Sequence, residues 1–520
     1  MESSPENSVT RNFNPFLTSD ALQGMGITGL IYEPLLQFDL ALPSTKPYDW
    51  LATNYEFSQN GKSITFTIRQ GVKWSNGTPL TPADVAFTFN YIKKNPAINL
   101  GALNIESVTT SGDTVTVTFP TPQFTNLENI GGMAILPESI WASVKDPATF
   151  TDPDPVGTGP YTLESFAQSG ITLVKNPDYW QESKIQVPKV FFPVYSSNTA
   201  VLSALFSGQI DWTGNYIPNL QRDFVDTDPA SHHYWEAAGS SNALWPNLNA
   251  WPTNQLAVRQ AIDLAINRSA IGAEGESGLE SPLTNATGIT LPTYQAWSGP
   301  VSDDTVNADG DPAGAKNVLQ HAGWTLGTNG YFEKNGQTLA LNLIDPSSYT
   351  DYAQDDVLIA QELKAAGIDV TFVGLPVSTW STDVAKGKFQ LTLHWGSGGV
   401  TPYNLYDNWL DDSLLSSAGA TGDYEGLRDQ TIESDLAQLS ASNGVAAQTA
   451  ALTPIEKYVE QNLPVIPTTT AADWFEYNSQ NYTNWPTQSD MYDSGEPSGT
   501  NNGPGTGSDE VVLLHLTPTS

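Results

Sequence analysis

Three glycines near the amino terminus stand at the spacing of a phosphate-binding turn. Gly24, Gly26 and Gly29 form the pattern G-x-G-x-x-G, which in dinucleotide-binding proteins lets the backbone approach a pyrophosphate. That chemistry needs a strand before the glycines and an acidic residue about twenty positions later. The residues before them, RNFNPFLTSDA, have no strand pattern, and Asp49 lies in KPYDW, which is not a strand end. We therefore expect no dinucleotide site, and glycines that let a helix approach another backbone closely.

Other residues of types that could act in catalysis or bind a metal do not form a catalytic pattern. The chain has no cysteine, which excludes thiol catalysis, disulfides and cysteine–zinc sites. None of the five histidines lies in an H-E-x-x-H motif, and the adjacent pair His232 and His233 points in different directions in most backbones. Neither a G-x-S-x-G nor a complete G-x-x-x-x-G-K-[ST] motif is present. The sequence predicts no enzyme, no cofactor and no metal site.

Charge and aromatic content narrow the class further. The chain has 21 basic and 56 acidic residues, a net charge of −35, which disfavours binding to nucleic acid or to anionic lipids. It also has 15 Trp, 20 Tyr and 19 Phe. Because Trp and Tyr combine an apolar ring with a polar atom, this enrichment is typical of a large mixed core or of an aromatic-lined ligand site.

Local patterns predict a mixed α/β chain of two or three domains. Turns at 59–62 and 111–113 indicate hairpins, and Thr81 followed by Pro82 indicates the start of a helix. The segments 254–271, 311–324 and 355–366 have helical spacing, and a strand follows Gly367. Near the end, NNGPGTGS (501–508) predicts a flexible linker, and VVLLHL (511–516) predicts a last short strand.

One long segment resembles the signature of a known family. SITFTIRQGVKWSNGTPLTPADVAFTF (63–89) is similar to the signature of the family 5 extracellular solute-binding proteins, the oligopeptide, dipeptide and oligosaccharide receptors of ABC importers. The matching residues are Arg69, Gly71, Val72, Lys73, Trp74, Gly77, Thr78, Pro79, Leu80, Asp84 and Val85. Further similar segments follow in order: LIYEPL (30–35), PVGTGPY (155–161), KNPDYW (175–180), ALFSGQIDW (204–212), VRQAIDLAINR (258–268) and LPVIP (463–467).

The resemblance implies a periplasmic-binding-protein type II-like fold, in which two α/β lobes joined by a two-strand hinge close on a ligand. The implied lobe I comprises 1–49, an extra subdomain at 50–160, 161–239 and the return at 469–520. The implied lobe II comprises 240–468, with the crossings near 238–242 and 467–472. Trp74 lies in the signature itself, so we expect it in the core.

The ligand class depends on the segment after Trp395. Peptide-binding members carry an Asp a few residues after the corresponding Trp, which pairs with the ammonium of the peptide. Here Gly, Ser, Gly and Gly follow, and the first Asp is Asp407. LHWGSGGVTPYNLYDNWL (393–410), NWPTQSDMY (484–492) and VVLLHLTP (511–518) are instead similar to the cello-oligosaccharide-binding branch.

A neutral β-linked glucan offers apolar C–H faces to aromatic rings and hydroxyls to polar side chains. The candidate ligand-binding residues are Trp395, Trp245, Tyr403, Asn242, Asn247, Asn249, Glu33 and Trp212. The alternatives are core packing for the Trp residues, backbone bonding for Asn247 and Asn249, and a structural ion pair for Glu33.

Together these features predict a monomeric binding component of an ABC importer that captures oligosaccharides such as cellobiose and longer, and passes them to permease subunits. The polar start, MESSPENSVTRNFNPF, has no apolar signal core, so we expect a mature periplasmic or cell-surface chain. A lipid anchor would need an N-terminal Cys, which this sequence lacks. The alternatives are a peptide receptor of the same family and a glycosidase with an aromatic cleft.

Overall fold

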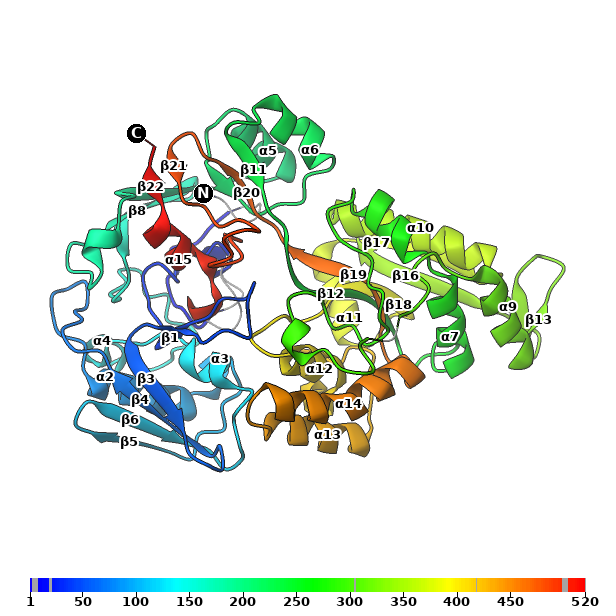
Figure 1. The fold of residues 1–520 in the computed structure, drawn as a ribbon, viewed down its shortest axis with the longest axis horizontal. Coiled ribbons are helices and arrows are strands. Elements are labelled where there is room, and N and C mark those ends of the chain that lie inside the picture. The colour runs from blue at the N-terminus through cyan, green and yellow to red at the C-terminus, as the bar shows by residue number, and fades with distance from the viewer. Residues whose placement is uncertain (2–7, 18–20, 304, 418, 498–503, 520) are drawn as a thin grey trace. The chain divides into compact units, whose positions relative to one another are not determined.

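The computed structural model describes residues 1, 8–17, 21–303, 305–417, 419–497 and 504–519 (Figure 1). The chain divides into two compact units: unit 1 is Met1–Ala237 with Asp473–Ser520, and unit 2 is Ala238–Ala472. The chain enters unit 2 at the start of strand β12 (Ala237–Pro246) and leaves it at the end of β19 (Ile466–Asp473). These two strands are neighbours in one sheet.

The signature segment of unit 1 forms an antiparallel sheet covered by a helix. The sheet has the order β3-β4-β6-β5, with β3 Ala52–Phe57, β4 Ser63–Ile68, β5 Ser107–Ser111 and β6 Thr114–Thr118. Alternate residues of β4 are buried, and the ring of Phe66 stacks on Phe89 of α2 (Pro82–Lys94) at 6.5 Å. The backbone N–H of Thr81 donates to Asp84 at 2.9 Å, which caps α2. Both predicted hairpins and this helix are confirmed, and Trp74 is buried as expected.

The remainder of unit 1 consists of small sheets and short helices. The sheets are β7 (Tyr161–Ala167), β8 (Gly170–Lys175) and β9 (Lys189–Pro193); β10 (Trp212–Thr213), β20 (Glu476–Asn478) and β11 (His232–Tyr234); β1 (Leu36–Gln37) and β2 (Tyr48–Asp49); and β21 (Tyr482–Thr483) and β22 (Thr517–Pro518). The helices include α1 (Ala21–Gly24), α3 (Leu127–Gly131), α4 (Glu138–Trp141), α5 (Asn198–Phe206), α6 (Leu220–Asp223) and α15 (Ser508–His515), with 3-10 turns η1 (Pro96–Ile98), η2 (Glu182–Lys184), η3 (Val225–Thr227) and η7 (Pro504–Thr506).

The end of the chain differs from its sequence prediction. VVLLHL was predicted as a strand, but 511–515 belong to helix α15, so that prediction is wrong. A short continuous apolar run fits a buried strand and a buried helix equally well, and Asp509 and Glu510 in the first turn favour the helix. Of the predicted linker, 501–503 lie outside the described residues, and Pro504–Thr506 form η7.

The glycine pattern lies in α1 and the turns that follow it. Gly26 has a φ of 74°, and a Cβ there would overlap the carboxylate of Asp509 on α15. The glycine therefore makes room for a side chain of α15, where we had expected a backbone.

Unit 2 is built on a mixed five-stranded sheet with the order β17-β16-β18-β12-β19. Its other strands are β16 (Ala340–Pro346), β17 (Asp369–Leu375) and β18 (Leu391–Trp395). β16 runs parallel to β17 and to β18, whereas β12 runs antiparallel to β18. A separate small sheet contains β13 (Thr325–Leu326), β14 (Phe332–Lys334) and β15 (Gln337–Thr338).

Helices pack on both faces of this sheet, so its strands are apolar on both sides. Leu244 of β12 belongs to the core shared with α7 (Leu256–Ala265), α9 (Pro312–His321) and α10 (Thr350–Ala365). Ala243 and Trp245 belong to the core of α12 (Tyr403–Leu410), α13 (Gln430–Ser440) and α14 (Val445–Asn462). Shorter elements are α8 (Arg268–Ala270), η4 (Ile271–Gly275), η5 (Gln295–Trp297), α11 (Val377–Ala385) and η6 (Asp412–Leu414). No helix among the described residues has both the length and the apolarity needed to cross a membrane.

Candidate functional site

An exposed tryptophan ends the central strand β18 of unit 2. Trp395 is 42% exposed, although tryptophan is usually well buried. Its ring lies 6.3 Å from Tyr352, 6.4 Å from Tyr349 and from Trp380, and 4.3 Å from His394. We call these five rings the aromatic platform. The four neighbouring rings fix Trp395, so that its exposed surface is available for stacking.

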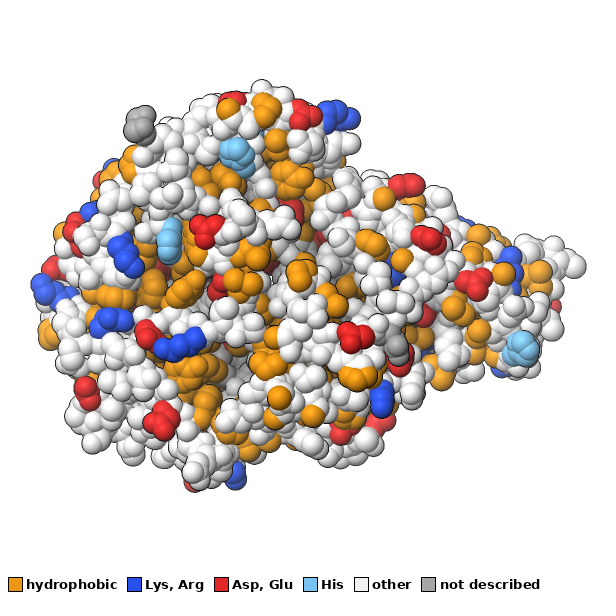
Figure 2. All heavy atoms as spheres, in the orientation of Figure 1, with side chains coloured by type: hydrophobic (Ala, Val, Ile, Leu, Met, Phe, Trp, Pro, Cys, Tyr) orange, Lys and Arg blue, Asp and Glu red, His pale blue; other side chains and the backbone are white. Residues whose placement is uncertain are grey.

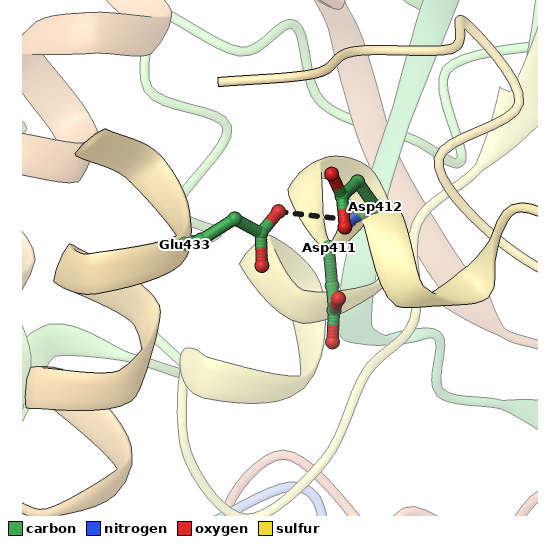
Figure 3. A group of neighbouring side chains, drawn as sticks. All are labelled: Asp411, Asp412 and Glu433. Carbon is green, nitrogen blue, oxygen red and sulfur yellow. Dashed lines mark hydrogen bonds between the residues drawn. The ribbon is translucent and has the colours of Figure 1, made fainter. Parts of the chain in front are cut away.

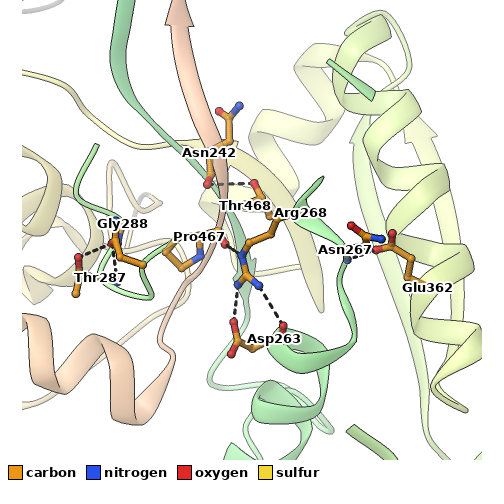
Figure 4. Close-up of polar contacts among 10 residues, drawn as sticks. Asn242, Asp263, Asn267, Arg268, Thr287, Gly288, Glu362, Pro467 and Thr468 are labelled. Carbon is orange, nitrogen blue, oxygen red and sulfur yellow. Dashed lines mark hydrogen bonds and ion pairs between the residues drawn. The ribbon is translucent and has the colours of Figure 1, made fainter. Parts of the chain in front are cut away.

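A buried polar network lies behind the platform. Asn242 on β12 pairs with Trp395 in the sheet register. Its amide nitrogen donates to Glu280 at 2.7 Å and to Thr469 at 3.2 Å, and its side-chain oxygen accepts a bond from the Tyr352 hydroxyl at 2.8 Å. Its carbonyl oxygen accepts a bond from Thr468 at 3.1 Å (Figure 4). Asn242, predicted to contact ligand, is therefore fully occupied and instead holds Tyr352 in place.

The same network joins the two strands that connect the units. Glu280 also accepts the backbone N–H of Ala472 at 2.9 Å, and burial raises its pKa well above the ordinary value. Nearby, buried Arg268 donates to Asp263 at 2.5 Å and to the carbonyl of Pro467 at 2.8 Å (Figure 4). β19 is thus anchored to the body of unit 2 at both of its ends.

The other predicted residues of β12 and its following turn do not reach the platform surface. Trp245 is fully buried, with ring centroids 4.6 Å from His394 and 5.0 Å from Tyr424. β12 ends at Pro246, so Asn247 and Asn249 follow the strand in a turn. Asn247 donates to the carbonyls of Gly387 and Phe389, and exposed Asn249 donates to that of Gly426. The structure thus places both asparagines in backbone bonds, the alternative noted above.

Tyr403 begins helix α12 and is half-buried against the core of α12–α14. Burial, with the nearby Asp407 carboxylate, raises the pKa of Tyr403 far above its usual range. The structure does not bring Tyr403 into the platform.

His394 connects Trp245 to the platform. Its Nδ1 lies 2.7 Å from the carbonyl oxygen of Trp395, which fixes the imidazole beside the exposed ring. The surrounding rings poorly solvate an imidazolium, so the pKa of His394 is lowered to about 4. The histidine is therefore neutral at ordinary pH and acts as a flat packing surface.

The two candidates in unit 1 are buried. Glu33 accepts a bond from the Trp180 indole at 2.8 Å, and burial raises the pKa of Glu33 to about 7. Trp212 donates to the carbonyl of Gly495 at 2.8 Å and packs against Trp485. Trp212 lines a small pocket of about 190 Å³ with Tyr482 and Trp485. The ion pair considered for Glu33 is replaced by a hydrogen bond.

Sequence reasoning missed other aromatic surfaces. Tyr349, Tyr352 and Trp380 join Trp395 from segments with no recognisable ligand motif. Unit 1 has an open pocket of about 630 Å³. It is lined by Val225, His233, Tyr234, Trp235, Tyr477, Thr487, Gln488 and Ser489. The run HHYW (232–235) is the one sequence signal that could have indicated it.

A group of acidic residues in unit 2 has the spacing of metal ligands. Carboxylate oxygens of Asp411, Asp412 and Glu433 lie within 4.8 Å of one another (Figure 3). Glu433 accepts the backbone N–H of Asp412 at 2.9 Å, so the contact joins the start of η6 to α13. The three carboxylates are partly solvated, and we assign them this structural role.

The arrangement of strands and helices has clear relatives among solved structures. An oligopeptide-binding protein of an ABC transporter from Thermotoga maritima superimposes with a TM-score of 0.88 at 24% identity, over 100% of this chain and 98% of that one. Its mannohexaose-bound form superimposes with a TM-score of 0.84, at the same identity and coverage. The predicted fold, that of the type II periplasmic binding proteins, is confirmed.

The family follows from the sequence match. Residues 46–462 match the model of the bacterial extracellular solute-binding proteins, family 5. The chain belongs to this family, which confirms the prediction of a binding protein and not an enzyme. It is 27% identical to the oligopeptide-binding protein OppA of Bacillus subtilis (strain 168) over 55% of this chain and 56% of that one. It is 26% identical to the nickel-binding periplasmic protein of Escherichia coli (strain K12) over 80% of this chain and 78% of that one.

Proposed function

We propose that this protein captures an oligosaccharide outside the cytoplasm and delivers it to the membrane subunits of an ABC importer. The ligand is a β-linked gluco-oligosaccharide, such as cellobiose or a longer homologue. The two units close on it by bending at the passages in β12 and β19. The protein acts as a monomer, in the periplasm or at the cell surface, where a lipid anchor would hold it. The observation that carries this proposal is the exposed ring of Trp395 on its rigid platform.

The chemistry of the platform suits a neutral sugar. A β-linked glucose unit presents a flat C–H face that stacks on an indole, while its hydroxyls need hydrogen-bonding groups at the rim. The loop after Trp395 is Gly396-Ser397-Gly398-Gly399, without a charged group. A Cβ on Gly398 would lie 2.9 Å from the carbonyl oxygen of Gly239, so the loop lies tightly against β12. A close, uncharged loop beside an aromatic face favours a ligand that needs no counter-charge.

Two similarities support the sugar class. The Thermotoga maritima protein of the same fold was solved with mannohexaose bound, so this fold accommodates an oligosaccharide. The choice of β-linked glucose rests on the likeness of 393–410 to the cello-oligosaccharide branch.

A peptide is the second candidate, favoured by the names of several relatives. A peptide ammonium needs a carboxylate at the site. Asp351, half-buried on α10 next to Tyr349, could supply one, because it lies close enough to raise the pKa of that tyrosine.

Thermal unfolding of the purified protein against two ligand panels tests the proposal. One panel holds cello-, xylo-, laminari- and manno-oligosaccharides, and the other holds peptides of two to five residues. A ligand at about 100 times its Kd stabilises the folded state by roughly 2.7 kcal/mol. We expect the unfolding midpoint to rise with cello-oligosaccharides. A rise with peptides alone, abolished by Asp351→Asn, would replace the sugar by a peptide.

A further inference from the structure

Helix α10, which carries Tyr352 of the platform and directly follows Tyr349, has two consecutive acidic residues that are completely buried. These are Asp355 and Asp356. Among the residues that the structure describes, no N–H or hydroxyl group donates to any of their four carboxyl oxygens. Asp355 instead hydrogen-bonds to the carboxyl group of Glu276, just after η4, and Asp356 to that of Asp345 on β16. Two carboxyl pairs thus attach α10 to two different neighbours.

A bond between two carboxyl groups exists only when one of them keeps its proton. Both oxygens of Glu276 likewise receive no N–H or hydroxyl donor from the described part of the chain, so Asp355 is its hydrogen-bonding partner. Asp345 accepts the backbone N–H of Leu393 at 2.7 Å and long bonds of 3.4 Å from the Thr392 hydroxyl, and it also contacts Asp356. The backbone is shaped for the first pair, because a Cβ on Gly275 would overlap the Asp355 carboxylate.

The surroundings offer these pairs no compensating cation. The titratable groups on α10 and the elements packed against it are Asp351, Tyr352, Glu362 and Lys364 on α10, Glu274 and Glu280 on and after η4, Asp369 on β17, Arg259 and Asp263 on α7, Arg268 on α8, and Lys316 and His321 on α9. The two arginines donate to backbone carbonyls, and Arg268 also to Asp263. Among the described residues, no Lys, Arg or His forms an ion pair with any of the four carboxyls.

We propose that unit 2 is built for an acidic medium, its folded state holding one shared proton in each of the pairs Glu276–Asp355 and Asp345–Asp356. Loss of either proton places two carboxylates in contact inside the protein and loosens α10. Because Tyr352 lies on α10 and Tyr349 directly precedes its first residue, the aromatic platform loosens with it. This inference does not depend on which ligand the platform binds.

The pH dependence follows from the direction of the pKa shifts. Burial, and then neighbouring acidic groups, raises the pKa of Glu276 to about 11 and that of Asp345 well above its ordinary value. In the unfolded chain both titrate near pH 4. The folded state therefore holds more protons above pH ~4, and stability is full below that pH and falls as the pH rises. Each retained proton lowers the folding equilibrium constant about tenfold per pH unit.

The inference is tested by thermal unfolding of the full chain between pH 3.5 and pH 8. The wild type, an amide variant and a control variant are compared. We expect the unfolding midpoint of the wild type to fall by at least about 5 °C from pH 4 to pH 7. The variant Glu276→Gln/Asp345→Asn replaces each shared proton by a permanent amide donor, so its midpoint should fall much less. The control Glu333→Gln/Asp309→Asn removes the same charge from two exposed positions and should follow the wild type.

Two results would overturn the inference. One is a wild-type midpoint that stays constant or rises from pH 4 to pH 7. The other is equal slopes for the amide variant and the control variant. If the double amide variant does not fold, infrared spectroscopy of the single variants Glu276→Gln and Asp345→Asn decides: each must show a weaker carbonyl stretch of protonated carboxyl groups than the folded wild type at pH 6.5. Absence of this stretch from the folded wild type would also refute the shared protons.

Discussion

At the scale of single residues, similar side chains have opposite roles. Trp395 and Trp245 both lie on paired strands of one sheet, yet one is 42% exposed and the other is completely buried. The difference comes from position, because Trp395 ends its strand and Trp245 lies under α12–α14. We therefore propose ligand stacking for Trp395 and support of His394 for Trp245.

Trp395→Ala should weaken binding of the ligand found in the panels by at least about tenfold, which corresponds to ~1.4 kcal/mol. The unfolding midpoint without ligand should change little, because the ring is exposed. Titration calorimetry measures the first quantity and scanning calorimetry the second. Trp251→Ala removes an equally exposed indole outside the platform and is the matched control. Unchanged affinity in Trp395→Ala would remove this residue from the site.

Asn242→Ala should destabilise the protein by about 2–4 kcal/mol, because it leaves the buried Glu280 carboxyl and Tyr352 hydroxyl short of partners. Asn249→Ala, at an exposed position with one side-chain bond to a carbonyl, should cost less than about 1 kcal/mol. Denaturant unfolding of both variants measures these costs. Equal costs would contradict the structural role assigned to Asn242.

At the scale of elements, two of the family motifs of unit 1 are joined by backbone hydrogen bonds. LIYEPL and PVGTGPY lie side by side: the N–H of Gly159 donates to the carbonyl of Ile31 at 2.9 Å, and that of Tyr161 to the carbonyl of Leu30 at 3.2 Å. A Cβ on Gly157 would overlap the Ile31 carbonyl oxygen. Glycine at 157 is therefore required by the approach of two chain segments more than a hundred residues apart.

Gly157→Ala should lower the stability of unit 1 by several kcal/mol or prevent its folding, since the obstructing atom belongs to the backbone. Gly24→Ala is the control, because a Cβ there meets nothing within 4 Å. The yield of soluble protein and the unfolding midpoint report the effect. A Gly157→Ala protein as stable as the control would show that the two segments can separate without cost.

Elements with a local signal could be predicted from the sequence, and the site largely could not. The Thr81 cap, the Asn60-Gly61 turn and the spacing of 355–366 each determine structure within a few residues. Trp395 was selected from the sequence because a glycine-rich loop follows it at the end of a predicted strand. Tyr349 and Trp380 were missed because α10, α11 and β18 meet only through the tertiary fold.

At the scale of the whole molecule, acidic residues strongly outnumber basic ones. The described ion pairs are mostly exposed, and Lys and Arg are sparse on the face shown in Figure 2. Carboxyl pairs also occur in unit 1, where Glu510 hydrogen-bonds to Glu33 inside the core. A net charge of −35 at neutral pH leaves self-repulsion largely uncompensated.

Raising the salt concentration from about 10 mM to 150 mM at pH 7 should therefore raise the unfolding midpoint, because the screening length falls from ~30 Å to ~8 Å. The gain should shrink at pH 3.5, where most surface carboxylates are protonated. Scanning calorimetry at both pH values measures the difference. A midpoint that falls with salt at pH 7 would mean that attractive ion pairs outweigh the repulsion.

The order in which the chain is synthesised has a consequence for how the two units are completed. Unit 2 is one continuous stretch, and all its strands exist once residue 472 has been made. Unit 1 is interrupted, because some of its elements come from the last 48 residues. One is β20, the middle strand of the sheet β10-β20-β11. Another is α15, whose acidic residues lie against Gly26 and Glu33. The unit whose strands begin first is thus finished last, and a nascent chain truncated before β20 contains every element of unit 2 but only an open unit 1.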